Sequence, residues 1–65
     1  MKNNLQYLTK WCHSMGYSIR IGLNIVSITH KNKRKMVNIQ NIINMNKRSL
    51  LVQLKEIEQY MMEDK

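Results

Sequence analysis

The stretch that decides the fold is YSIRIGLNIVSITH, residues 17–30. Apolar and polar side chains alternate on both sides of the short segment 22–24, and this period of two is typical of half-buried β-strands. Gly22 and Asn24 accept the backbone conformations of a tight turn. We therefore expect two strands, 17–21 and 25–30. Because so short a connection cannot cross over a sheet, they should pair antiparallel.

The residues after the second strand leave one choice open. The run 31–35, KNKRK, has no apolar member and is predicted to form a hairpin tip. The alternating run 36–40 predicts a third strand. Its isoleucines and those that follow also fit one face of a helix, and short apolar runs do not decide between the two. Residues 36–43 are therefore predicted as strand or helix.

Apolar residues at helical spacing flank this region on both sides. In the amino-terminal part they recur every three or four residues, at Leu5, Leu8, Cys12 and Met15. This stripe predicts an amphipathic helix that stops at Gly16. A second stripe predicts a carboxyl-terminal helix with Asn46 as its N-cap. The second stripe consists of Leu50, Leu54, Ile57 and Met61.

The order helix, strand, strand, third strand, helix predicts one small α+β domain over residues 1–65. Both helices should cover one face of an antiparallel sheet of two or three strands. A chain of 65 residues allows one domain and only a thin core.

Charge is segregated along the chain. Residues 1–55 hold ten basic groups and no acid, whereas 56–65 carry four acids and Lys65, so the two segments have charges of +10 and −3. The total is +7. A field of one sign over most of a small domain favours polyanionic partners, above all nucleic acid.

The predicted phosphate contacts are basic side chains in three places. The hairpin tip and the start of the last helix each carry a cluster, and Arg20 lies on the first strand, with His30 expected on the same outer face. A helix that begins with cations concentrates backbone donors, dipole and positive charge at one spot, which suits a phosphate. The candidate nucleic-acid contacts are Lys31, Lys33, Arg34, Lys35, Lys47, Arg48 and Arg20.

This element order resembles that of double-stranded RNA-binding domains, which run helix, three strands, helix and place cations at the start of the second helix against phosphates. Lys47 and Arg48 stand at the corresponding place. The first inter-strand turn of this chain has no histidine and its last helix has no alanine, so no contact residue of the family is carried over.

The sequence argues against an enzyme. Cys12 and His13 are neighbours on a helix and point about 100° apart, so they cannot share a proton. Glu56 and Glu58 diverge for the same reason. Cys12, His13 and His30 are too few for a four-ligand zinc site. We expect no catalytic residue, no metal and no cofactor.

The expected location is the cytoplasm, without a membrane partner. The longest aliphatic run is 50–52, far short of the roughly 20 apolar residues that span a bilayer. The amino end lacks the apolar segment of a secretory signal. A single cysteine forms no internal disulfide.

Two functions follow from these patterns. The first is a small regulatory protein that binds DNA or RNA with little sequence preference. The second is an inhibitor or adaptor, of the kind that mobile elements encode, that docks on an acidic host protein through the same surface. The acids could instead contact basic groups of a second copy and form a homodimer. These acids are Glu56, Glu58, Glu63 and Asp64.

Overall fold

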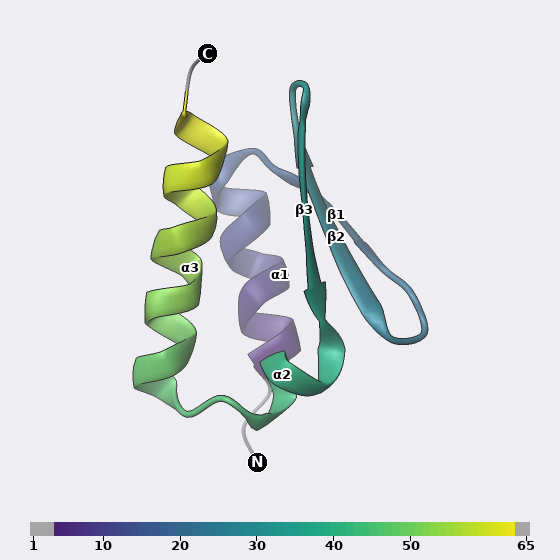
Figure 1. The fold of residues 1–65 in the computed structure, drawn as a ribbon, viewed down its shortest axis with the longest axis vertical. Coiled ribbons are helices and arrows are strands. Elements are labelled where there is room, and N and C mark those ends of the chain that lie inside the picture. Colours follow the sequence, from purple (N-terminus) through teal and green to yellow (C-terminus); the bar gives the residue numbers. More distant parts are fainter. Residues whose placement is uncertain (1–3, 64–65) are drawn as a thin grey trace.

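The computed structural model describes residues 4–63 as an α+β fold with an amino-terminal helix, a three-stranded antiparallel sheet and two carboxyl-terminal helices (Figure 1). The predicted fold class is confirmed. The elements are α1 (Asn4–Met15), β1 (Ser18–Ile21), β2 (Ile25–His30), β3 (Lys33–Asn38), α2 (Ile39–Asn44) and α3 (Lys47–Met62).

The strands are ordered β1-β2-β3, so β2 is the central strand. Ile28 of β2 pairs with Ile19 of β1 and with Lys35 of β3. Val26 and Ile28 are fully buried, because their side chains point to the face that the helices cover. This face is called the inner face below.

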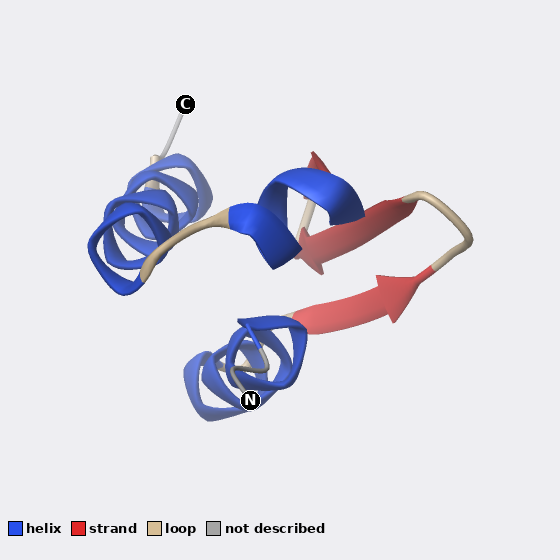
Figure 2. Cartoon of the chain, turned by 90° about the horizontal axis from the view of Figure 1, so that it is seen from below, coloured by secondary structure: helices blue, strands red, loops and turns tan. Residues whose placement is uncertain are grey.

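Helices α1 and α3 lie on the same side of the sheet, and no described element covers the opposite, outer face (Figures 1 and 2). The core fills the space between the helices and the inner face. Both helical stripes contribute to it as predicted, although Leu5 and Met15 are only partly buried. The buried apolar residues are Leu8, Cys12, Tyr17, Val26, Ile28, Val37, Ile42, Leu50, Leu54, Ile57 and Met61.

The two predicted helix signals are confirmed by their hydrogen bonds. Gly16 has φ +83, and it ends α1 in a Schellman motif: the Gly16 amide donates to the His13 carbonyl at 3.2 Å and the Tyr17 amide to the Cys12 carbonyl at 2.9 Å. At the start of α3 the Asn46 side-chain oxygen accepts a bond of 2.8 Å from the Ser49 amide.

The prediction for the polar run 31–35 is wrong in its extent. The turn contains only Lys31 and Asn32, and β3 already begins at Lys33. The register pairs His30 with Lys33, so two residues close the hairpin. Long-range pairing with β2 decides this boundary, and the local polar pattern does not reveal it.

Both readings of residues 36–43 are correct in part, because the chain changes from strand to helix inside this segment. Strand β3 continues to Asn38, whose side chain accepts a bond of 2.8 Å from the Gln40 amide and thereby caps α2. The Ile39 amide donates to the Asn24 carbonyl at 2.8 Å, which fixes the point of change. The short helix α2 is an addition to the predicted element order.

Asn4 joins the beginning of the described chain to α2. Its side-chain amide donates to the Ile42 carbonyl at 2.8 Å and to the Met45 carbonyl at 2.7 Å. These carbonyls lie at the end of α2, where the Ile42 carbonyl also accepts a bond of 3.3 Å from the Met45 amide. Asn4 therefore secures α2 against α1 from within a buried position.

Candidate nucleic-acid interface

The outer face of the sheet carries polar and basic side chains at its centre. Residues paired across an antiparallel sheet point to the same side, so the register places two rows side by side. One row contains Ser18, Thr29 and Arg34, and the next contains Arg20, Ser27 and Met36. We call Ser18, Arg20, Ser27, Thr29 and Arg34 the outer-sheet patch.

Arg20 and Arg34 stand at diagonal positions of the outer-sheet patch. Arg20 lies opposite Ser27, and Arg34 lies opposite Thr29. The strands that carry the arginines are separated by β2, so their backbones are about 10 Å apart. The patch lines a shallow hollow of about 440 Å³. Both arginines are exposed, whereas Ser27 and Thr29 are partly buried between them.

The described acidic residues lie away from this face. Glu56 and Glu58 belong to α3, and Glu63 follows directly after it. Since α3 packs against the inner face, these carboxylates and the outer-sheet patch are on opposite sides of the sheet. Asp64, the remaining acid, lies outside the described residues. The patch is therefore a surface of hydroxyl and guanidinium groups, the donors that phosphate oxygens accept.

Lys33 and Lys35 are not part of this surface, which corrects the expectation that the cations of residues 31–35 form one cluster at the hairpin tip. Their pairing with His30 and Ile28 directs both side chains toward α3. The Lys33 ammonium donates to the Tyr60 carbonyl at 3.0 Å, and both ammonium groups lie 5.5 Å from the centre of the Tyr60 ring. Both ammonium groups are therefore attracted to the Tyr60 ring by cation–π interaction.

Lys31 remains exposed at the hairpin tip. It adopts φ 55, in the left-handed region that side chains with a Cβ rarely occupy. The tip lies near the carboxyl end of α3, where Lys31 and Lys33 line a hollow together with Met62 and Glu63.

Lys47 and Arg48 are at the other end of the molecule. The start of α3 and the β2–β3 tip lie at opposite ends of the long axis (Figure 1), along which the molecule extends 38 Å. Both side chains are exposed. The Ser49 and Leu50 amides already donate to Asn46, through its side chain at 2.8 Å and its carbonyl at 2.9 Å, so part of the donor set of this helix end is in use. The predicted cations thus form separate groups.

His30 does not lie beside Arg20, contrary to expectation. Side chains alternate along β2, so His30 points to the same side as Val26 and Ile28. The ring therefore lies on the inner face and is partly buried. The imidazole packs on the Tyr17 ring at 4.9 Å between centroids. Tyr17 in turn meets Trp11 edge-on at 5.5 Å. These aromatic groups belong to packing on the helical side.

Cys12 is poorly suited to nucleophilic chemistry. The side chain is fully buried, and burial raises the pKa of the thiol to about 11, which keeps it protonated at neutral pH. Burial also raises the pKa of Tyr17, and repulsion from the Glu58 carboxylate and from Cys12, once ionised, raises it further. Among residues 4–63, no three histidine, cysteine or acidic side chains are grouped so as to hold a metal ion.

Within the part of the chain that the structure describes, none of the helices combines the length and apolar character needed to cross a membrane. No protein-family model, curated protein or solved structure matches this chain. The resemblance to double-stranded RNA-binding domains therefore rests on element order alone.

Three members of the outer-sheet patch were missed by sequence reasoning: Ser18, Ser27 and Thr29. Their signal was present in the alternation of the strands, since each is a polar residue between two neighbours that are buried or partly buried. What the alternation does not give is the register that brings Arg34 of β3 next to Thr29.

Proposed function

We propose that the protein binds nucleic acid through the outer-sheet patch, with Arg20 and Arg34 contacting phosphates. The observation that carries this proposal is the pair of exposed arginines set diagonally around serine and threonine hydroxyls, on the face opposite the acidic residues of α3. Arginine binds phosphate oxygens through two parallel hydrogen bonds, and hydroxyl groups add neutral donors.

The composition of the patch favours contact with the backbone of a duplex over stacking on bases. Single-strand binders combine a basic groove with aromatic side chains on which bases stack. The outer face of the described strands offers no aromatic residue, and Tyr17 and Trp11 are engaged on the helical side. The expected binding therefore has little sequence preference, and duplex DNA and duplex RNA are both candidate ligands.

Salt dependence tests the proposal directly. We expect a labelled duplex of about 20 base pairs to bind at about 50 mM salt and to lose affinity steeply by about 200 mM, because neutralised phosphates release counterions. In the double variant Arg20→Gln with Arg34→Gln, the slope of log affinity against log salt should fall by about 1.8, close to two phosphate contacts on DNA. Fluorescence anisotropy measures both quantities.

Matched variants separate the patch from net charge. Lys10→Gln with Lys55→Gln removes the same charge from the helices, and Lys33→Gln with Lys35→Gln removes it from the inner face. Both pairs, and Lys47→Gln with Arg48→Gln, should reduce affinity less than the arginine pair. Absence of binding to DNA and RNA at low salt would reject the proposal. Equal losses in all pairs would reject the assignment to the outer-sheet patch.

A further inference from the structure

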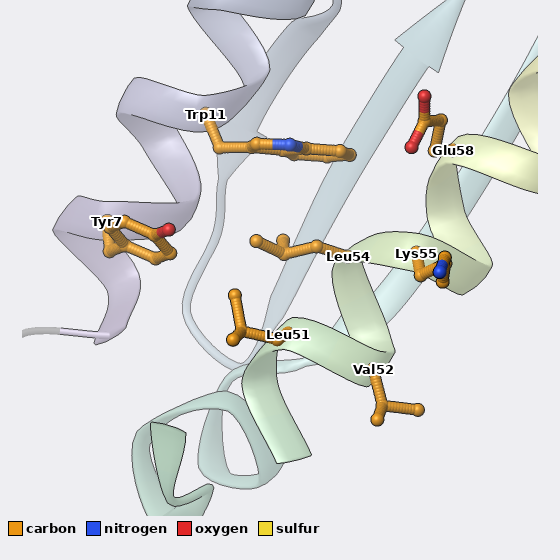
Figure 3. Close-up of a pocket in the computed structure, with 7 residues that line it drawn as sticks. All are labelled: Tyr7, Trp11, Leu51, Val52, Leu54, Lys55 and Glu58. Atoms are coloured by element: carbon orange, nitrogen blue, oxygen red, sulfur yellow. The ribbon is translucent and has the colours of Figure 1, made fainter. Parts of the chain in front are cut away.

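A second surface of different chemistry lies between the two long helices, away from the sheet. Tyr7 and Trp11 of α1 point toward Leu51 and Leu54 of α3 (Figure 3). Together they line a shallow apolar groove of about 390 Å³. Leu54 is buried and forms its floor, whereas Tyr7 and Leu51 remain 49% and 47% exposed.

The exposed apolar side chains of the groove do not belong to the hydrophobic core. The apolar stripe of α3 that faces the sheet is complete without Leu51 and Val52, and Val52 is 54% exposed. Tyr7 likewise stands outside the buried stripe of α1. An apolar surface of this kind, with tryptophan and tyrosine along its α1 side (Figure 3), has the composition of a protein-docking site.

The borders of the groove carry a positive excess. On a helix, residues three or four apart share a face, so Arg48 and Lys55 flank Leu51 and Lys10 follows Tyr7 on α1. Glu58 is the acidic side chain that lines the groove. A partner should therefore present an apolar centre between carboxylates.

We propose that this groove binds an acidic amphipathic helix contributed by another protein. A helix laid between two helices buries an apolar face of i, i+3, i+4 and i+7 residues, and its flanking acids would meet Lys10, Arg48 and Lys55. A second copy of this chain is the poorer occupant, since a charge of +7 on each copy opposes association. The surface differs from the outer-sheet patch, so both could be occupied together.

A pair of synthetic peptides tests the proposal with the full chain. The first is a fluorescein-labelled amphipathic helix of about 14 residues with leucines on one face and glutamates beside them. The second has lysine at every glutamate position. We expect the acidic peptide to bind with a Kd below about 100 μM and the basic peptide to bind at least about tenfold more weakly.

Variants at exposed positions identify the site without disturbing the core. The double variant Tyr7→Ala with Leu51→Ala should bind the acidic peptide at least about tenfold more weakly, and its circular dichroism spectrum should be unchanged. Arg48→Glu with Lys55→Glu should reverse the preference between the two peptides. Arg20→Gln with Arg34→Gln is the control, and it should leave peptide affinity within about twofold.

Each alternative result contradicts the proposal. Equal binding of both peptides, or an equal loss in the control pair, would mean that general electrostatics is responsible. No binding of the acidic peptide at about 100 μM would reject the site. A dimer in sedimentation that Tyr7→Ala with Leu51→Ala dissociates would assign the groove to a second copy. If the protein binds anionic lipid vesicles and the same double variant abolishes this binding, the groove would be assigned to lipid.

Discussion

The two faces of the sheet are formed by the same strands but differ in burial and in the chemistry of their side chains. On the inner face Val26 and Ile28 are fully buried under the helices, whereas on the outer face Ser27 and Thr29 alternate with them and stay accessible. A single residue step along β2 therefore separates the core from the candidate interface. Stability should depend on one face and ligand binding on the other.

The same contrast holds for cations on β3. Arg34 projects from the outer face, whereas Lys33 and Lys35 lie against Tyr60 on the helical side. The consecutive basic residues of β3 therefore do not form one cluster. Because side chains alternate along a strand, Arg34 lies on the exposed outer face and its two neighbours lie on the inner face. Counting charges along a strand overestimates any one footprint by about a factor of two, because neighbours point to opposite faces.

The largest expected effect comes from comparing alanine substitutions at two adjacent residues of β2, one on each face of the sheet. Ile28→Ala should lower the free energy of unfolding by about 2–5 kcal/mol, since it opens a cavity in a fully buried site. Thr29→Ala, one residue further on the outer face, should change it by less than about 1 kcal/mol. Urea denaturation followed by circular dichroism measures both. Similar losses in the two variants would show that the faces are not energetically distinct.

A smaller effect is expected at the join between α1 and α2. Asn4→Ala leaves the carbonyls of Ile42 and Met45 without their side-chain donor, which should cost about 1–3 kcal/mol of unfolding free energy. The control is Asn41→Ala, at an exposed position of α2. Equal melting temperatures for the wild type and Asn4→Ala would show that the buried bonds contribute nothing net.

The smallest effect is a pH dependence that originates in the core. Burial raises the pKa of Cys12 from 9.0 to about 11, so the contribution of the neutral thiol is fully present below pH 9 and is lost as the pH rises toward 11. Relative to Cys12→Ala, the wild type should lose about 1 kcal/mol of stability between pH 8 and pH 10. The contribution of the lysines to the pH dependence cancels in this comparison, because they titrate in both proteins. Parallel pH profiles for the two proteins would contradict the burial of the thiol.

The sequence was sufficient for the elements whose signals are local. The stripe that ends at Gly16, the alternation of β2 and the cap at Asn46 each depend on residues within a few positions of one another. These are the features that helix and strand periodicity encode directly.

The candidate site was predicted less well, since it depends on contacts distant in sequence. Lys33 is held by Tyr60, which lies 27 residues further along the chain, and nothing within the basic run indicates this. Arg20 was correctly expected on the outer face from strand parity. The hydroxyl groups around it, and the groove formed by Tyr7 and Leu51, required the register of the sheet and the packing of the helices.

The bonds of Asn4 have a consequence for the order in which the molecule assembles. They join residues 38 and 41 positions apart, whereas the two hairpins close through turns of a few residues. Closing the longer loop costs more chain entropy, so the strands should pair before the amino-terminal helix docks. During synthesis on the ribosome, the bonds of Asn4 can form only after residues 42–45 have emerged.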